Sequence, residues 1–155
     1  MIRAPYGEQR LWPDHCVQNS PGADFHPDLV VVENKDLILK KGTDKRIDSY
    51  SAFFENDRHT EPRFDDGQGF AEKLYAKNIK SVVFSGLAFD YCVGWNAYDA
   101  SLEGFKVYVV KDATRAIAPD TEASMTAKLQ AAGVQIIHAQ DLPKIFAPNG
   151  PKLTP

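Results

Sequence analysis

The chain has 155 residues, of which 43% are hydrophobic and 25% charged, and its formal net charge is −3. This balance indicates a globular protein with a real core and excludes disorder as the main state. It also argues against nucleic acid held on a basic surface, and no apolar run approaches the roughly 20 residues of a membrane span.

The first third of the chain is rich in turn residues and is expected to be loop-like. Its first eight residues lack the apolar middle of a signal peptide, and two cysteines do not make a disulfide scaffold, so we expect a cytoplasmic protein. Leu29–Val32 and Leu37–Leu39 are short apolar runs, of which at least one should be a strand. Residues 42–67 are predicted to form a long connection with one helical turn near Ser51–Phe54.

After Gly67 the hydrophobic pattern becomes regular, with helical spacing alternating with short apolar runs. We predict helices over 68–78, 90–103 and 120–132, and strands over Ser81–Ser85, Lys106–Val110 and Val134–Ile137. Asp90 is predicted to cap the second helix. Alternating strands and helices form right-handed βαβ units, so the fold class is α/β with a mostly parallel sheet. We expect one domain over 1–147 and a proline-rich tail over 148–155.

The carboxyl ends of the strands are where open parallel sheets hold their functional groups. This rule points to Lys40–Gly42, Gly86–Cys92 and Asp112–Arg115. Cys92 follows a predicted strand near the first turn of a helix, where backbone N–H groups and the helix dipole stabilise a thiolate or a developing oxyanion. A nucleophile is one interpretation of Cys92, and a buried cysteine packing as a small hydrophobe is the other.

Lys41 and His15 are the other two candidates for chemistry. Lys41 is expected to end an earlier strand and so to lie at the same sheet edge, and a lysine ammonium close to a cysteine lowers the pKa of the thiol. The alternative for Lys41 is a solvated side chain beside Lys40. His15 lies in a rigid segment flanked by aromatic and proline residues, and it is a metal ligand, a general base or neither.

Six segments, in this order, resemble the nicotinamidases, which belong to the isochorismatase-like cysteine hydrolases. They are Leu11–Val17 (LWPDHCV), Pro21–Ala23 with His26 and Pro27, Lys40–Gly42, Ser49–Phe53 (SYSAF), Gly86–Val93 (GLAFDYCV) and Asp112–Arg115 (DATR). The resemblance runs from about Tyr6 to Ile137. Its most specific part is the Trp-Pro-x-His-Cys-Val segment.

The resemblance implies a parallel sheet with helices on both faces and a hydrolase of NAD metabolism that acts in pyridine nucleotide salvage. Cys92 would attack the carboxamide carbon of nicotinamide, ammonia would leave, and water would hydrolyse the resulting thioester. Lys41 would stabilise the thiolate. The Leu87–Ala88 peptide matches a cis bond of the family, and the N–H groups of Ala88 and Cys92 would form the oxyanion hole.

The resemblance also implies a substrate pocket and a metal site. Trp12 would pack on the pyridine ring, with Tyr50, Leu87 and Tyr91 lining the pocket. His15 matches one ligand of a divalent metal, for which zinc is the first choice and iron or manganese the alternatives. Small-molecule substrate is the expected partner, homo-oligomerisation is left open, and neither nucleic acid nor a membrane is expected.

The sequence departs from the family at its beginning. The family starts with an apolar strand that carries a catalytic aspartate, followed by an Asp-x-His pair of the metal site, whereas residues 1–10 contain neither Asp nor His. We therefore expect a missing N-terminal β-strand, an incomplete metal site and an open sheet edge. The alternative function is an inactive remnant serving as a ligand-binding or structural subunit. A related hydrolase of another amide or of isochorismate is disfavoured by Trp12 and His15.

Overall fold

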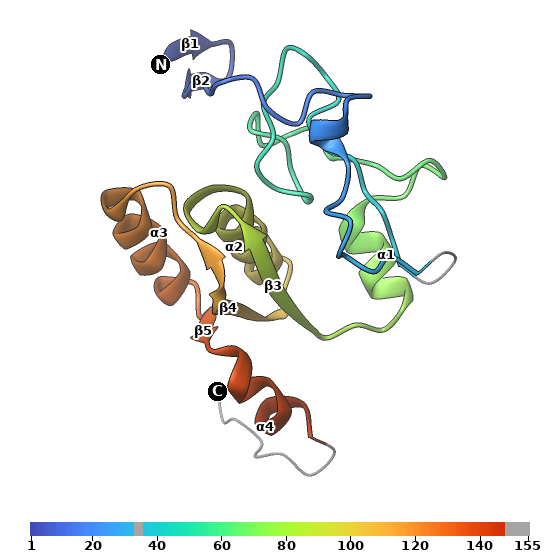
Figure 1. The fold of residues 1–155 in the computed structure, drawn as a ribbon, viewed down its shortest axis with the longest axis vertical. Helices are drawn as coiled ribbons and strands as arrows, with labels where there is room; N and C mark the ends of the chain where they lie inside the picture. The colour runs from blue at the N-terminus through green and yellow to red at the C-terminus, as the bar shows by residue number, and fades with distance from the viewer. Residues whose placement is uncertain (33–35, 148–155) are drawn as a thin grey trace. The chain divides into compact units, whose positions relative to one another are not determined.

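The computed structural model describes residues 1–32 and 36–147 (Figure 1). The chain divides into two compact units, Met1–Leu39 and Lys40–Pro155. The single domain expected over 1–147 stays a prediction, and the expected proline-rich tail lies outside the described residues. No helix in the described ranges is long and apolar enough to cross a membrane.

The first unit contains one small hairpin. Strand β1 (Ile2–Ala4) pairs antiparallel with β2 (Gly7–Gln9), and Gly7 has a positive φ of 134° at the turn between them. A short 3-10 turn, η1 (Pro21–Ala23), follows. Its proline at the first position suits a helical start, because proline has no N–H to satisfy there.

The strand expected at Leu29–Val32 or Leu37–Leu39 is wrong, since neither run is extended into a ladder in the described residues. Most of these side chains are exposed, and Val30 is 82% exposed. β-Branched residues favour a strand only where a neighbouring backbone supplies hydrogen bonds and one face is covered. The apolar, β-branched composition of these two runs therefore predicted a strand that the described residues do not form.

The second unit is built on a parallel three-stranded sheet in the order β3-β4-β5, which confirms the predicted topology. Strand β3 is Ser81–Leu87, β4 is Lys106–Arg115 and β5 is Gln135–Ile137. Ser81 pairs with Lys106, and the register shifts between Phe84 and Gly86. The central strand β4 runs five residues beyond its predicted end and carries the sheet edge towards Arg115.

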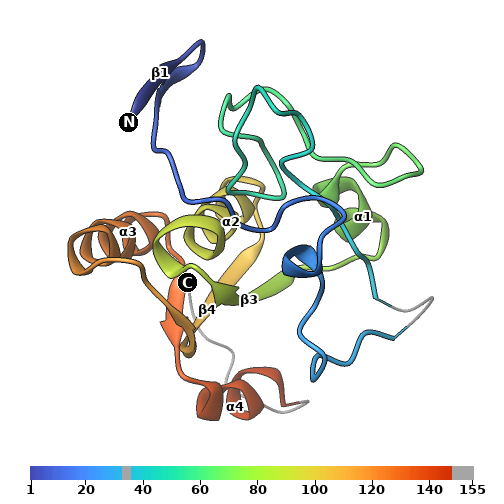
Figure 2. The ribbon, with the colours of Figure 1, turned by 45° about the horizontal axis from the view of Figure 1, so that its top comes forward.

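Helices cover both faces of this sheet, as predicted. They are α1 (Phe70–Ala76), α2 (Gly94–Leu102), α3 (Pro119–Ala131) and α4 (Leu142–Phe146), with a π-helical turn η2 (Phe89–Val93) and a 3-10 turn η3 (Ala139–Asp141). Val107 and Val109 join the core with α2 and α3, which lie side by side in Figure 2. Tyr108 points to the opposite face, where its ring meets Phe146 of α4 at 5.6 Å.

The connection over residues 42–67 has no helix, so the helical turn expected at Ser51–Phe54 is wrong. A buried ion pair anchors it instead. The Arg58 guanidinium donates to both carboxylate oxygens of Asp99 on α2, at 2.9 and 2.5 Å, and Asp99 is fully buried. The same guanidinium lies 5.2 Å from the Phe54 ring and 5.4 Å from the Trp95 ring. Bidentate pairing and stacking hold this segment where local backbone hydrogen bonds do not.

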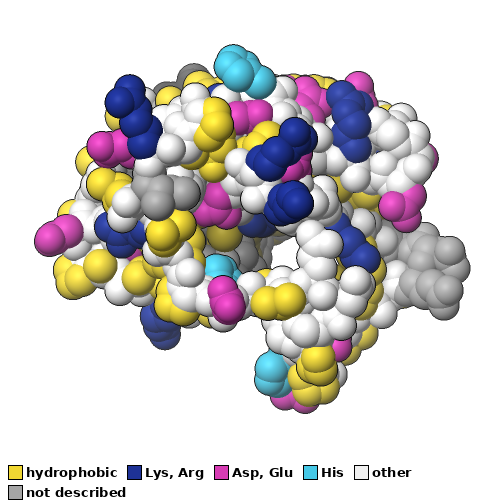
Figure 3. Space-filling model, turned by 90° about the horizontal axis from the view of Figure 1, so that it is seen from above, with side chains coloured by type: hydrophobic (Ala, Val, Ile, Leu, Met, Phe, Trp, Pro, Cys, Tyr) yellow, Lys and Arg dark blue, Asp and Glu magenta, His cyan; other side chains and the backbone are white. Residues whose placement is uncertain are grey.

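Acidic and basic side chains are interspersed on the face drawn in Figure 3. This distribution agrees with the small net charge of the whole chain.

Gly94 sets how closely α2 approaches its neighbours. A Cβ added there would lie 2.5 Å from both the Met125 side chain on α3 and the Phe89 carbonyl oxygen. Real Cβ atoms do not tolerate such distances, and the Phe89 oxygen belongs to the backbone and cannot turn aside. Glycine is therefore required at the start of α2 for close packing rather than for an unusual φ.

We expect Gly94→Ala to destabilise the protein by about 2 kcal/mol or more, because overpacking forces the backbone to shift. Urea unfolding followed by circular dichroism measures the change. Gly22→Ala is the matched control, because its added Cβ meets only the Ser20 hydroxyl at 3.7 Å. A Gly94→Ala protein as stable as the parent would contradict the packing described for α2.

Candidate active site

Cys92 lies in η2, directly between the end of β3 and the start of α2. The Leu87–Ala88 peptide bond at this junction is cis, as the sequence resemblance predicts. The carbonyl of Ala88 accepts hydrogen bonds from the amides of Tyr91 at 3.1 Å and Val93 at 3.0 Å. These two bonds close a turn around Cys92, whose side chain is half-buried.

The structure brings Lys41 to this cysteine. Lys41 Nζ lies 3.6 Å from Cys92 Sγ and donates a hydrogen bond to the Ser49 carbonyl at 2.6 Å. The lysine is therefore a directed contact of the thiol, and the solvated alternative does not describe it. The catalytic roles of the two residues remain a proposal.

The turn after Lys41 is held by Gly42 and Glu55. Gly42 has a φ of 64°, and its N–H donates to Glu55 Oε1 at 3.2 Å. Glu55 is only 4% exposed, and an added Cβ at Gly42 would lie 3.4 Å from Ser49 Cβ. Glycine thus suits both the left-handed backbone and the close approach that directs Lys41 inwards.

Two predicted pocket residues meet beside the cysteine. The rings of Tyr50 and Tyr91 form an edge-to-face pair with centroids 5.3 Å apart. Leu87, the third, is 72% exposed at the end of β3. Aromatic rings in this arrangement offer an apolar, polarised wall on which a flat heteroaromatic ligand can pack.

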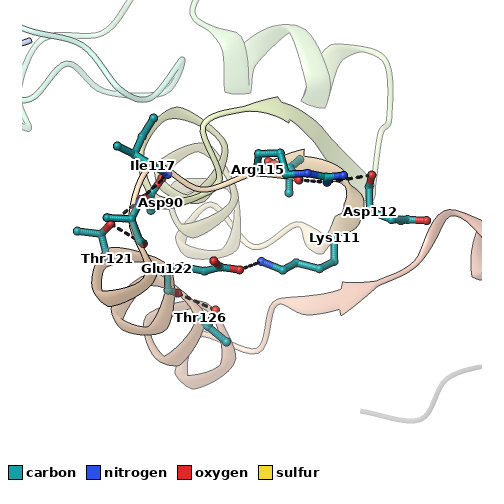
Figure 4. A network of polar contacts seen from close by, with 10 residues as sticks. Asp90, Lys111, Asp112, Arg115, Ile117, Thr121, Glu122 and Thr126 are labelled. Carbon is teal, nitrogen blue, oxygen red and sulfur yellow. Dashed lines mark hydrogen bonds and ion pairs between the residues drawn. The ribbon is translucent and has the colours of Figure 1, made fainter.

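Asp90 does not cap the helix that follows it, which corrects the expectation from the sequence. Its buried carboxylate accepts the amides of Ile117 and Ala118 and the hydroxyl of Thr121, and so caps the start of α3 instead (Figure 4). Burial alone raises the pKa of Asp90, but the hydrogen bonds from Thr121, Ile117 and Ala118 outweigh it and lower the pKa overall. Asp90 thereby ties the turn that carries Cys92 to α3.

The third expected edge segment, Asp112–Arg115, is engaged in local contacts. The Arg115 guanidinium donates to the carbonyl oxygens of Asp112 and Thr114 at 3.4 and 2.6 Å. Lys111, just before it, pairs with Glu122 of α3 (Figure 4). The Lys111 ammonium also lies 4.0 Å from the centroid of the Phe89 ring in η2. These contacts brace the turn of Cys92 and supply no further reacting group there.

Trp12 and His15 lie in the first unit. Trp12 is half-buried, with the Arg10 guanidinium 5.5 Å from its ring. His15 is exposed, and its Nδ1 lies 2.7 Å from the Pro13 carbonyl oxygen. Their predicted roles as ring platform and metal ligand stay predictions.

The described residues do not fit a complete metal centre. A backbone carbonyl on Nδ1 of His15 leaves Nε2 as the ring nitrogen that could bind a metal, which is the usual arrangement of a ligating imidazole. One imidazole falls short of the three protein ligands typical of a catalytic zinc. Within residues 1–32 and 36–147, no cluster of three or more His, Cys, Asp or Glu side chains could hold a metal ion.

Asn96 is a site residue that the sequence did not reveal. It follows Cys92 by four positions, and its side chain bonds to the backbone of both Cys92 and the segment that holds Lys41. The spacing of four residues was the available signal, because residues i and i+4 share a helix face. The distant partners near Tyr50 could not be inferred from spacing.

Comparison with known proteins assigns the family. The model of the isochorismatase domain matches residues 2–141. The chain belongs to the isochorismatase family. A nicotinamidase of Acinetobacter baylyi is 43% identical to this isochorismatase-family chain over 144 residues, which cover 91% of the chain and 63% of that relative. The chain thus spans about three fifths of the length of a curated relative that it matches.

Solved structures of family members share the fold. A nicotinamidase and pyrazinamidase of Acinetobacter baumanii has a TM-score of 0.82 at 39% identity, covering 91% of this chain and 65% of that one. The pyrazinamidase of Pyrococcus horikoshii in complex with zinc has a TM-score of 0.66 at 33% identity, covering 83% and 63%. PnC1 from L. infantum in complex with nicotinate has a TM-score of 0.71 at 34% identity, covering 84% and 62%. The predicted isochorismatase-like α/β fold is confirmed.

We expect Asp90→Asn to lose about 2 kcal/mol of stability at pH 7, since hydrogen bonds to a charged acceptor are the stronger kind. The folded pKa lies below the ordinary value of 3.8, so the carboxylate's contribution is present above about pH 4 and is lost as the pH falls through the folded pKa. The stability difference between parent and variant should therefore shrink on acidification below pH 4.

Urea unfolding across pH 2 to 7, at intervals of roughly half a unit, measures this difference. Asp14→Asn is the control, because Asp14 is exposed in the first unit. A constant difference across the whole range would contradict the capping role of the Asp90 carboxylate.

Proposed function

We propose that this chain carries the catalytic cysteine of a nicotinamidase, which hydrolyses nicotinamide to nicotinic acid and ammonia. The observation that carries the proposal is the contact of 3.6 Å between Lys41 Nζ and Cys92 Sγ at the junction of β3 and α2. A nicotinamidase relative at 43% identity and a PnC1 structure in complex with nicotinate support the choice of a pyridine carboxamide as substrate.

The reaction would proceed through the cysteine. The Cys92 thiolate attacks the carboxamide carbon, and the electron pair of the carbonyl moves to its oxygen. The N–H groups of Ala88 and Cys92 donate to this oxyanion, which lowers the barrier by about 3 kcal/mol for each donor. The carbonyl re-forms as the amide nitrogen takes up a proton from solvent water and leaves as ammonia, and the proton that water loses in the second half returns to solvent. The product of this first half is a thioester between Cys92 and the pyridine carboxyl group.

Water completes the cycle. It attacks the thioester carbon, loses a proton and expels the Cys92 thiolate, which releases nicotinic acid and restores the enzyme. Lys41 would act twice in this sequence, because the thiolate is the attacking group in the first half and the leaving group in the second. An ammonium beside the sulfur favours both events by stabilising the same anion.

The pyridine ring would be held by aromatic side chains. Tyr50 and Tyr91, already paired edge to face, would line the pocket together with Leu87 at the end of β3. Trp12 would stack on the ring. A flat ring gains binding energy from such contacts without the need for a charged partner.

Asp90 is unsuited to supply the proton, because its oxygens already accept from two amides and one hydroxyl. The proposed cofactor is a divalent metal, with zinc the first choice and iron or manganese the alternatives. The pyrazinamidase relative in complex with zinc supports that class of ion. His15 would be one ligand.

The product, nicotinic acid, indicates the metabolic pathway in which the reaction would take place. Nicotinic acid is the form in which a pyridine ring re-enters NAD synthesis, so we place the activity in pyridine nucleotide salvage in the cytoplasm. Nothing in the comparisons favours the alternative of a catalytically inactive remnant.

We expect the protein to release ammonia and nicotinic acid from nicotinamide in equal amounts. Cys92→Ala should lower the turnover by about four orders of magnitude or more, because no group replaces the lost nucleophile. Ammonia release with chromatographic measurement of nicotinic acid tests this expectation.

Cys16→Ser is the matched control, since Cys16 is the other free thiol and is exposed in the first unit. The control should retain its activity. A protein without turnover, or a Cys92→Ala variant with undiminished turnover, would contradict the proposed function.

A further inference from the structure

Asn96 on α2 uses its whole amide group to join two backbone segments. Its Nδ2 donates to the Cys92 carbonyl at 2.7 Å and to the Tyr50 carbonyl at 3.3 Å. Its Oδ1 accepts the Ala52 amide at 2.9 Å. An asparagine amide has two N–H donors and one carbonyl acceptor, so each of these groups has a partner. The residue connects the turn of Cys92 to the segment 50–52, which is more than 40 positions earlier in the chain.

The same segment holds Lys41. The Ser49 carbonyl, next to Tyr50, accepts the Lys41 ammonium at 2.6 Å, and that ammonium lies 3.6 Å from Cys92 Sγ. The contacts therefore form a closed ring, which runs from the Cys92 backbone through Asn96 to residues 49–52, on to Lys41, and back to the Cys92 sulfur. Every contact in this ring lies within the second unit.

Residues 49–52 have no helix or strand of their own. Ladder hydrogen bonds do not fix their position, and a backbone group left without a partner costs free energy when it is buried. Ser49 and Ser51 are buried, at 6% and 1% exposure. The Asn96 amide supplies the Tyr50 carbonyl and the Ala52 amide with partners that regular structure would otherwise provide.

We propose that Asn96 is a positioning residue, which sets the distance between the Lys41 ammonium and the Cys92 sulfur. The inference rests on the proposed function, because it concerns the same thiolate. Without the Asn96 hydrogen bonds, residues 49–52 can move away from α2. Lys41, which is bonded to the Ser49 carbonyl, then moves with them. Coulombic attraction falls with distance, so the thiolate would lose its stabilising charge while the fold remained.

Alkylation of Cys92 by iodoacetamide tests the proposal, because only the thiolate reacts. The 155-residue chain, Asn96→Ala and Asn96→Ser are compared, and the Cys92 peptide is followed by mass spectrometry across pH. Asn96→Ser is the deciding variant. A serine hydroxyl can still reach the carbonyl four residues earlier, so Asn96→Ser retains the contact within the helix and loses the bridge to residues 50–52.

Both variants should shift the midpoint of Cys92 reactivity upwards by about one pH unit, which corresponds to a rate at pH 7 that is lower by up to about tenfold. Ser101→Ala is the matched control, because Ser101 on the same helix donates to the Tyr98 carbonyl, away from the ring of contacts. It should leave the midpoint unchanged. Circular dichroism shows that the compared variants are folded.

A folded Asn96→Ser variant with the parental midpoint would overturn the proposal, and so would a shift of the same size in Ser101→Ala. A purely structural role of Asn96 would lower the unfolding midpoint and leave the pH profile of Cys92 where it is. The readout involves no nicotinamide. Failure of this inference is therefore distinguishable from failure of the proposed function, which appears as absent ammonia release.

Discussion

The contact between the Lys41 ammonium and the Cys92 sulfur is the interaction on which the account depends. At 3.6 Å, in a half-buried setting, a positive charge interacts with a thiolate much more strongly than it would in open water. The two residues are 51 positions apart, so their meeting is a product of the fold. The sheet, the π-helical turn and the connection over residues 42–67 each help to place these two side chains next to each other.

Three side chains hold these segments together. Each one bonds to a backbone group or a charged group that lies far away in the chain. Asp90 ties the turn of Cys92 to the start of α3. Asp99 pairs with Arg58 and ties the long connection to the middle of α2. Asn96 ties the same connection to the carbonyl of Cys92 itself. Buried polar networks of this kind specify one arrangement when every member is satisfied.

Regular structure was predictable where the hydrophobic period was clear. The alternation after Gly67 predicted the parallel sheet and its three main helices, because buried faces impose spacings of two and of 3.6 residues. The sheet-edge rule correctly pointed to Cys92, which lies just after β3. For Lys41 the rule relied on a preceding strand that the described residues do not form, so its contact with Cys92 depends on other interactions. Helix α4, with five residues, and the 3-10 turn before it are too short to show a hydrophobic period in the sequence.

The wrong and missed predictions share one cause, because each depends on a partner far away in the chain, whether for a side-chain hydrogen bond or for a neighbouring strand. Asp90 read as the cap of its own helix, yet its partners lie 27 to 31 residues further on. Leu29–Val32 has strand-forming side chains but no neighbouring ladder in the described residues. The roles of Asn96 and Asp99 depend on partners in a connection with no periodic pattern, so local sequence could not indicate them.

The most direct test compares the two free thiols of one sample. Iodoacetamide alkylation of Cys92 and Cys16, followed peptide by peptide across pH, should show Cys92 becoming reactive at lower pH than Cys16, and Lys41→Met should remove that difference. Coincident pH profiles for the two cysteines in the parent chain, or a Cys92 profile that Lys41→Met leaves in place, would contradict the account.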